Sequence, residues 1–227
     1  QRLFRKTAHS HNNRSHGMNT IAVKIPADSI ELEDELVVPL TATGIVVFAH
    51  GSGSSRFSPR NGFVAQVLQQ RGVATLLFDL LTRSEDQDYS ARFDIALLTR
   101  RLLAATAWLK INPFTENLKI GYFGASTGAA AALQAAAMSG ADIAAVVSRG
   151  GRPDLAGANV LSRVLAPTLL IVGGADQAVI ELNEQAYALL ECKKEFAIIP
   201  GATHLFDEPG TLEKAAKLAT DWFLNYL

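Results

Sequence analysis

Six short, almost continuous apolar runs recur along the chain, and they constrain its fold more than any other feature. They lie at 44–49, 73–78, 118–123, 143–147, 168–172 and 196–199. Runs without alternating polar positions suit strands that are buried on both faces, as in a parallel sheet covered by helices. The runs therefore predict a buried, mostly parallel sheet at the centre of the protein.

The segments between these runs have the apolar spacing of helices. We predict helices at 59–71, 91–111, 127–139, 180–191 and 211–226. Strands that alternate with helices indicate a doubly wound α/β sheet with right-handed crossovers. Before the first run, alternating apolar positions at 21–25 and 30–39 flank Pro26-Ala27-Asp28. This pattern predicts an antiparallel hairpin at a sheet edge.

The length of 227 residues suits one domain, which we place at residues 18–227. Residues 1–17 differ from the rest because they are basic and rich in histidine, with His9, His11 and His16. They lack the apolar centre of a secretory signal, so we interpret them as a disordered leader, an upstream extension or an expression remnant. The histidine spacing matches no structural zinc pattern.

Charge and cysteine content narrow the possible partners. The net charge is -1 and no basic run follows the opening segment, which argues against binding to nucleic acid or an anionic membrane. A small-molecule substrate is expected, and the oligomeric state stays open. The single cysteine, Cys192, excludes an intrachain disulfide and fits a reducing, cytoplasmic location. No apolar run approaches the length that spans a bilayer.

The pentapeptide Gly124-Ala125-Ser126-Thr127-Gly128 joins one apolar run to an alanine-rich helical segment. This is the strand, sharp turn and helix that a Gly-x-Ser-x-Gly nucleophile elbow requires. Its glycines leave room where the strand end and helix start crowd together, and the helix N-terminus favours a developing oxyanion. The motif therefore predicts Ser126 as a nucleophile.

A serine hydroxyl needs a base and the base needs an orienting carboxylate, and both candidates follow later strands. His204 lies just past the last apolar run, and Asp176 follows the run before it. The order Ser126, Asp176, His204 is the order of an α/β-hydrolase triad. Glu181 is the alternative acid. Simpler roles stay open: a tight turn at Ser126, a helix cap at Asp176 and a loop position for His204.

These residues and their order resemble the α/β-hydrolase superfamily, and the spacing is similar to its compact dienelactone-hydrolase-like branch. The resemblance extends from about Val37 to Leu227. It implies Ser126, Asp176 and His204 as the triad, with the backbone amides of Ser52 and Thr127 as the oxyanion hole. Dienelactone hydrolases proper carry cysteine at the elbow, so the serine points to an esterase-type relative.

Several other residues at strand ends are candidates for substrate binding. Arg149 and Arg152 are candidates for binding an anionic substrate group. The same role is considered for Arg56 and Arg60. His50 is a candidate for shaping the loop whose amide faces the substrate, or for contacting the substrate itself. No dinucleotide fingerprint, P-loop or zinc-protease motif is present, so the sequence implies no cofactor and no metal.

Together these features predict a serine hydrolase that cleaves a small ester, thioester or lactone through an acyl-enzyme. Only about twenty residues, 148–167, separate two of the strands, which leaves little room for a lid and predicts an open cleft. Two alternatives stay open. The same triad could serve an acyltransferase or a peptidase, and the fold could instead belong to a binding protein without turnover.

Overall fold

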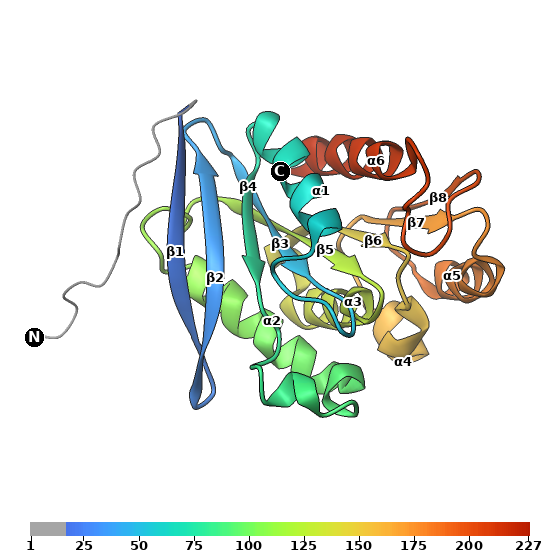
Figure 1. Ribbon diagram of the computed structural model, residues 1–227, viewed down its shortest axis with the longest axis horizontal. Coiled ribbons are helices and arrows are strands. Elements are labelled where there is room, and N and C mark those ends of the chain that lie inside the picture. Colours follow the sequence, from blue (N-terminus) through green and yellow to red (C-terminus); the bar gives the residue numbers. More distant parts are fainter. Residues whose placement is uncertain (1–16) are drawn as a thin grey trace, which may run out of the picture.

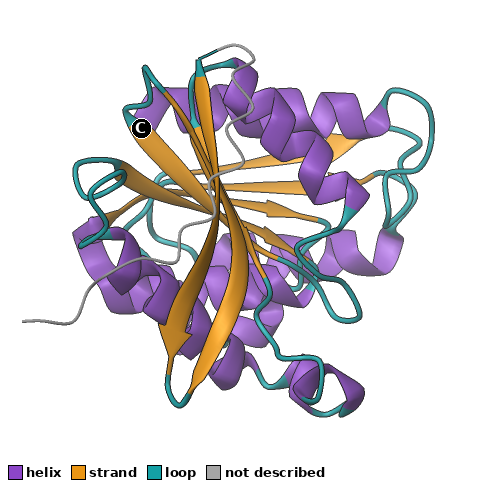
Figure 2. Cartoon of the chain, turned by 60° about the vertical axis from the view of Figure 1, so that its left-hand side comes forward, coloured by secondary structure: helices purple, strands orange, loops and turns teal. Residues whose placement is uncertain are grey.

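The computed structural model describes residues 17–227 and contains one eight-stranded sheet in the order β1-β2-β4-β3-β5-β6-β7-β8 (Figure 1). The strands are β1 (Met18–Ala27), β2 (Ile30–Pro39), β3 (Gly44–Ala49), β4 (Ala74–Phe78), β5 (Lys119–Ala125), β6 (Ile143–Arg149), β7 (Thr168–Gly173) and β8 (Lys194–Ile199). From β4 to β8 all pairings are parallel, whereas β1 and β2 pair antiparallel at one edge. The mostly parallel sheet and the edge hairpin predicted from sequence are confirmed, and Figure 2 shows the long twisted hairpin in front.

Helices cover both faces of the sheet, as a doubly wound fold requires. They are α1 (Pro59–Gln70), α2 (Ile95–Leu109), α3 (Thr127–Ser139), α4 (Ala158–Leu161), α5 (Gln177–Leu189) and α6 (Thr211–Tyr226). Helices α1 and α6 pack on one face, and α2, α3 and α5 pack on the other (Figure 1). The chain therefore buries two separate apolar layers, one on each side of the same strands.

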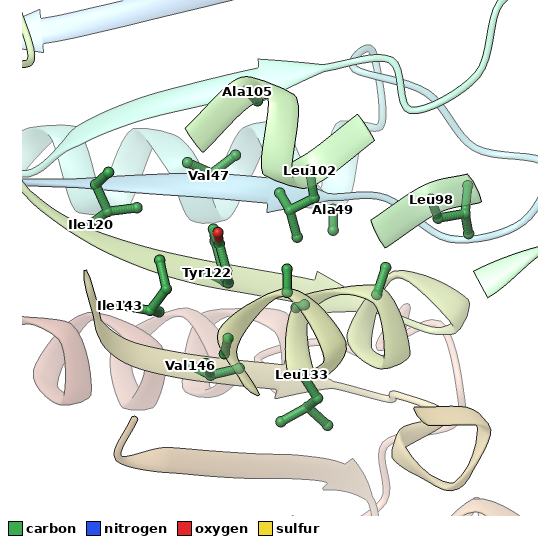
Figure 3. Close-up of a cluster of buried hydrophobic side chains, with 14 of the residues drawn as sticks. Val47, Ala49, Leu98, Leu102, Ala105, Ile120, Tyr122, Leu133, Ile143 and Val146 are labelled. Carbon is green, nitrogen blue, oxygen red and sulfur yellow. The ribbon is translucent and has the colours of Figure 1, made fainter. Parts of the chain in front are cut away.

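Helix α3 packs against the sheet through a face that is rich in alanine. The side chains of Ala129 to Ala132 are fully buried, and such small residues allow a close approach to the strands. Figure 3 shows part of this apolar layer, in which Leu133 of α3 and Leu102 of α2 belong to the same buried cluster as Val47 and Val146 of the strands. Tyr122 is the one hydroxyl drawn in that cluster, and its oxygen lies 2.6 Å from Thr106 Oγ1. This contact links β5, which leads into the elbow, to α2.

Two helix starts predicted from sequence were wrong: α5 begins at Gln177 rather than at 180, and the larger error concerns α2. The segment 91–111 was predicted as one helix, but 91–93 form a separate 3-10 turn and α2 begins at Ile95. Asp94 caps α2 by accepting a hydrogen bond of 2.9 Å from the Leu97 amide. A capping aspartate satisfies an otherwise unpaired helical amide, so it ends the preceding turn although the apolar spacing continues through it.

The sheet order reverses direction between β3 and β5. From β3 the chain moves outward to β4, and from β5 it moves the opposite way to β6. Ligands of open α/β sheets bind beyond the carboxyl ends of the strands at such a switch point. The segments leaving these two strands begin with His50 and Ser126. The topology therefore brings the two loops proposed for the oxyanion hole to the same crevice.

Asp34 is a buried carboxyl group on β2, and we expect it to make stability depend on pH. It is 5% exposed, and neither carboxyl oxygen has a hydrogen-bond partner among residues 17–227. Burial raises the pKa of Asp34 to about 9. The folded state then keeps a proton that the unfolded chain loses above about pH 4, so this residue's contribution to stability declines as pH rises toward 9.

Replacing this carboxyl removes that dependence. Asp34→Asn should gain stability over wild type as pH rises, by on the order of 4 kcal/mol more at pH 8 than at pH 5. Urea unfolding at the two pH values measures the difference. Glu35→Gln, an exposed change on the same strand, is the control and should show no such trend. A pH-independent effect of Asp34→Asn would contradict a buried neutral carboxyl.

Candidate active site

Ser126 occupies a strained backbone conformation between β5 and α3. Its φ is 50° and its ψ is -123°, whereas Thr127 is already the first residue of the helix. A non-glycine residue in such a region costs about 1–3 kcal/mol and persists only where the surroundings enforce it. The strain projects a half-buried serine from the end of the central strand. This is the local geometry that the pentapeptide predicts.

Glycines at two positions allow the neighbouring loop to approach this turn. A Cβ placed on Gly51 would lie 2.9 Å from Ser126 Cβ, so the loop after β3 passes directly beside the serine. A Cβ on Gly128 would lie 2.1 Å from the Ala49 carbonyl oxygen and 2.6 Å from that of His50. Both clashes are with backbone or with the turn itself, so neither can be relieved by a side-chain rotation.

Gly128→Ala should therefore separate the turn from the loop after β3. We expect a loss of about 3 kcal/mol or more in the free energy of unfolding. Gly62→Ala is the matched control, because a Cβ there meets nothing within 4 Å and Gly62 lies inside α1. That control should be neutral or stabilise by about 0.5–1 kcal/mol in thermal unfolding. Equal stability of the two variants would contradict the close packing.

Asp176 and His204 lie in contact although they are far apart in sequence. The Nδ1 atom of His204 is 2.7 Å from Asp176 Oδ2, and the carboxyl group is more buried than the ring. Asp176 stands at the N-cap position of α5, yet its side chain makes no capping hydrogen bond. The capping role that alone could explain this aspartate is therefore absent, and the carboxylate faces the imidazole.

This contact fixes the imidazole tautomer. A carboxylate only accepts hydrogen bonds, so Nδ1 carries the proton that it donates to Asp176, and Nε2 is the nitrogen left to accept a proton from a nucleophile. The alternative acid, Glu181, instead accepts a hydrogen bond from the Gln177 side chain within α5. The pair is thus a histidine oriented by an aspartate, which is the arrangement required of a general base.

The loop that follows β6 touches both the serine turn and the histidine loop. The Arg152 amide donates a 3.0 Å hydrogen bond to the Ser126 carbonyl oxygen. A Cβ on Gly150 would lie 3.2 Å from the His204 carbonyl oxygen and 3.7 Å from its ring carbon Cε1. Within residues 17–227 the Ser126 hydroxyl makes no hydrogen bond. The hydrogen bond between a nucleophile and its base often tightens only when substrate is bound.

Ser52 and Thr127 line one small hollow beside the turn, together with Gly51 and His50. In the part of the chain that the structure describes, neither backbone amide donates to a protein acceptor. Thr127 has no intrahelical acceptor because it is the first residue of α3. The two amides are thus available as donors at the positive end of a helix.

His50 holds the loop rather than offering a polar atom to a substrate. The Leu80 amide donates to its Nε2 at 3.0 Å, which places the proton on Nδ1, and Nδ1 lies 3.0 Å from the Gly51 carbonyl oxygen. Burial lowers the pKa of His50, so the ring stays neutral. Both ring nitrogens are engaged. The structure therefore favours the loop-shaping interpretation of His50 over direct substrate binding.

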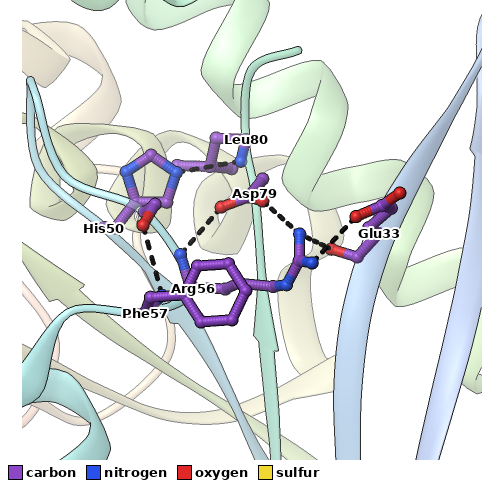
Figure 4. A network of polar contacts seen from close by, with 7 residues as sticks. Glu33, His50, Arg56, Phe57, Asp79 and Leu80 are labelled. Atoms are coloured by element: carbon purple, nitrogen blue, oxygen red, sulfur yellow. Dashed lines mark hydrogen bonds and ion pairs between the residues drawn. The ribbon is translucent and has the colours of Figure 1, made fainter. Parts of the chain in front are cut away.

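A polar network beside this loop was not found from the sequence (Figure 4). The Arg56 backbone amide donates to Asp79 Oδ1 at 2.7 Å, and its guanidinium pairs with both Asp79 and Glu33. The network borders a cavity of about 400 Å³ that is also lined by His50, Phe57 and other residues of the loops after β3 and β4. It ties the loop after β3 to the neighbouring strands.

The other three arginines proposed from the sequence do not offer a free anion site. Arg60 pairs with Asp207, and Arg152 forms two hydrogen bonds with Asp154. Arg149 was expected at the site mouth, but it is 8% exposed and lies between aromatic rings on the α1 and α6 side of the sheet. Side chains alternate along a strand, so Arg149 points to the same side as the buried Val147.

The switch-point crevice, the mostly parallel sheet with its edge hairpin, and the strained serine turn together define an α/β-hydrolase fold. The family model described as "Dienelactone hydrolase family" matches residues 36–227. The chain therefore belongs to the dienelactone hydrolase family. The expectation from the sequence resemblance is confirmed at the level of family and fold.

Individual relatives agree with this family. A crystal structure of dienelactone hydrolase from Anabaena variabilis is 56% identical, covers 93% of this chain and 100% of its own, and superposes with a TM-score of 0.90. Est1E from Butyrivibrio proteoclasticus shares the fold at 19% identity, with a TM-score of 0.77 and coverage of 90% and 98% of the two chains.

Two curated relatives from Mycobacterium tuberculosis strains carry the name "Putative phosphoribosyl transferase". Each is 58% identical over 205 residues, which cover 90% of this chain. The same residues cover 46% of each relative, so the chain spans about half the length of these proteins. Separately, no helix within residues 17–227 is long and apolar enough to cross a membrane.

Proposed function

We propose that this protein is a serine hydrolase that cleaves small esters, thioesters or lactones through an acyl-enzyme. The observation that carries the proposal is the contact of Asp176 with His204 in place of a helix cap. Its support comes from the strained Ser126 and from the two unpaired amides beside it. Membership of a hydrolase family agrees with this chemistry.

In the proposed reaction, Ser126 Oγ attacks the carbonyl carbon while His204 Nε2 takes the hydroxyl proton. The amides of Ser52 and Thr127 donate to the oxyanion of the tetrahedral intermediate. Its collapse breaks the bond to the leaving group, which receives the proton from His204. Water then attacks the acyl-enzyme with His204 again as base, and the acid product leaves with Ser126 restored.

We place a substrate group in the cavity beside the Arg56 network, although Ser126, Asp176 and His204 do not line it. It adjoins the loop that carries Ser52, and Phe57 and Leu81 contribute apolar surface among its charged lining residues. A cavity of about 400 Å³ suits a small group rather than a long acyl chain. The segment 79–94, whose short turns lie below β4 in Figure 1, forms part of its wall.

A labelling experiment tests the proposal most directly. A fluorophosphonate probe should react once per chain, and peptide mass spectrometry should place the label on Ser126. A panel of short p-nitrophenyl esters and lactones should show turnover that the probe abolishes. Absence of both labelling and turnover would instead favour a binding protein that keeps the fold.

The transferase name of the curated relatives calls for a separate assay. It describes proteins of which this chain spans 46%. We infer that Ser126, His204 and Asp176 carry acyl chemistry, since a histidine oriented by an aspartate activates a serine nucleophile. Incubation with 5-phosphoribosyl diphosphate should leave that compound unchanged and should not slow labelling. Release of diphosphate would contradict this assignment.

A further inference from the structure

Arg149 is a buried cation that the proposed reaction does not use. It is the last residue of β6 and is 8% exposed. Its Nε and Nη1 atoms are enclosed and have no hydrogen-bond partner among residues 17–227. Burial of a charge without a hydrogen-bonded partner is costly to a folded protein. The protein therefore holds this guanidinium in place at the expense of stability.

Two aromatic rings flank the guanidinium. Its central carbon lies 5.8 Å from the ring centroid of Phe123 and 5.8 Å from that of Phe206. Aromatic faces attract cations, and the attraction is larger where water is excluded. Burial lowers the pKa of Arg149 to about 10, so the side chain remains charged at neutral pH. The two charged residues that act electrostatically on Arg149, Arg60 and Asp207, already pair with each other.

Phe206 connects this cation to the histidine loop. It lies two residues beyond His204, is 2% exposed and has a φ of 58°, a strained value for a residue with a side chain. Next to Arg149, a Cβ on Gly150 would lie 3.4 Å from the Phe206 ring and 3.2 Å from the His204 carbonyl oxygen. Arg149 and Gly150 thus pack directly against the loop that carries His204 and Phe206.

We propose that Arg149 is a positioning residue whose guanidinium, held between Phe123 and Phe206, fixes the loop that presents His204. The inference rests on the proposed function, because the loop matters only if His204 is the base. A direct anion-binding role is disfavoured, since the side chain lines none of the described cavities. A group held against stability is characteristic of functional positions.

Arg149→Met tests the proposal with opposite effects on rate and stability. Because a small misplacement of a catalytic group is costly, kcat for a p-nitrophenyl ester should fall roughly ten- to a hundredfold while KM changes less than about twofold. The rate of Ser126 labelling by the probe should fall in parallel. The Tm should rise by a few degrees, because an unpaired buried charge is replaced by an apolar chain of similar length. Arg149→Lys, which keeps a cation, should recover most of kcat.

Further variants separate the possible failures. Phe206→Leu removes the aromatic ring and leaves the Arg149 guanidinium unchanged. It should lower kcat as Arg149→Met does. The double variant should be little worse than either single one if the contact carries the effect. Arg163→Met, an exposed change, is the control and should alter neither kcat nor Tm. Phe206→Leu also tests the contact if Arg149→Met fails to fold.

The outcomes are distinct. Unchanged kcat in Arg149→Met or in Phe206→Leu overturns the inference while leaving the proposed function intact. A kcat loss that Lys does not rescue and that comes with a lower Tm also overturns it, because that pattern describes a merely structural residue. A wild-type protein that neither labels nor turns over refutes the proposed function instead.

Discussion

Ser126→Ala is expected to remove probe labelling completely and to lower kcat for any ester substrate by roughly 10⁴-fold or more. The reason is that the hydroxyl is the only proposed atom that forms a bond to the substrate. His204, Asp176 and the two amides remain, so substrate binding should survive and KM should change little. Stopped assays with a p-nitrophenyl ester, together with intact-protein mass spectrometry, measure both effects.

Ser126→Gly is a second inactive variant, and it tests the backbone strain that Ser126→Ala retains. Glycine tolerates a φ of 50°, whereas alanine keeps the strain of the native residue. Ser126→Gly should therefore be equally inactive, yet it should unfold at a higher temperature than Ser126→Ala. Comparable residual turnover in both variants is expected from the remaining amides. Substantial activity in either one would show that another group is the nucleophile.

The fold was predictable because its signals are local and repeated. The apolar runs that became β3 to β8 need only burial on both faces, and the pentapeptide at Ser126 needs only the adjoining strand and helix. The predicted start of α2 was wrong because apolar spacing does not reveal a capping residue. The hydrogen bond from the Leu97 amide to Asp94 sets that boundary. Residues 1–16, including the three histidines, lie outside the described part of the chain.

The site was predictable where it depends on strand order and not where it depends on packing. Asp176 and His204 meet because β7 and β8 are neighbours, which the sequence of elements suggests. The pairing of Arg56 with Glu33 and Asp79 depends on β2 lying beside β4, and no local pattern reveals that neighbour. The predicted position of Arg149 at the site mouth was wrong, although the sequence contained a signal for the side to which it points.

That signal is the alternation of side chains along β6. Ala145, Val147 and Arg149 are two residues apart and share one face of the sheet. Two of them are apolar and buried under α1 and α6, so the third must point the same way. A run that reads as continuously apolar hides this alternation, which is why the arginine was expected at the site mouth. The alternation of side chains along a strand therefore decides whether a charged residue at the strand end can reach a substrate.

Asp176→Asn should lower kcat by about 10⁴-fold while the protein remains folded. An asparagine amide can donate to Nδ1 of His204, which moves the ring proton to Nε2 and leaves no lone pair facing the serine. The side chain makes no helix cap, so the free energy of unfolding should change little. Steady-state kinetics and urea unfolding of the same preparation separate these two effects.

Glu181→Gln is the matched control for this change. It removes a carboxylate from the same helix, but one whose described partner is Gln177 rather than His204. Its kcat should remain near that of wild type. If Asp176→Asn is fully active while Glu181→Gln is not, the acid lies on the first turns of α5 instead of at its N-terminus. The imidazole would then have to leave its 2.7 Å contact with Asp176 during turnover.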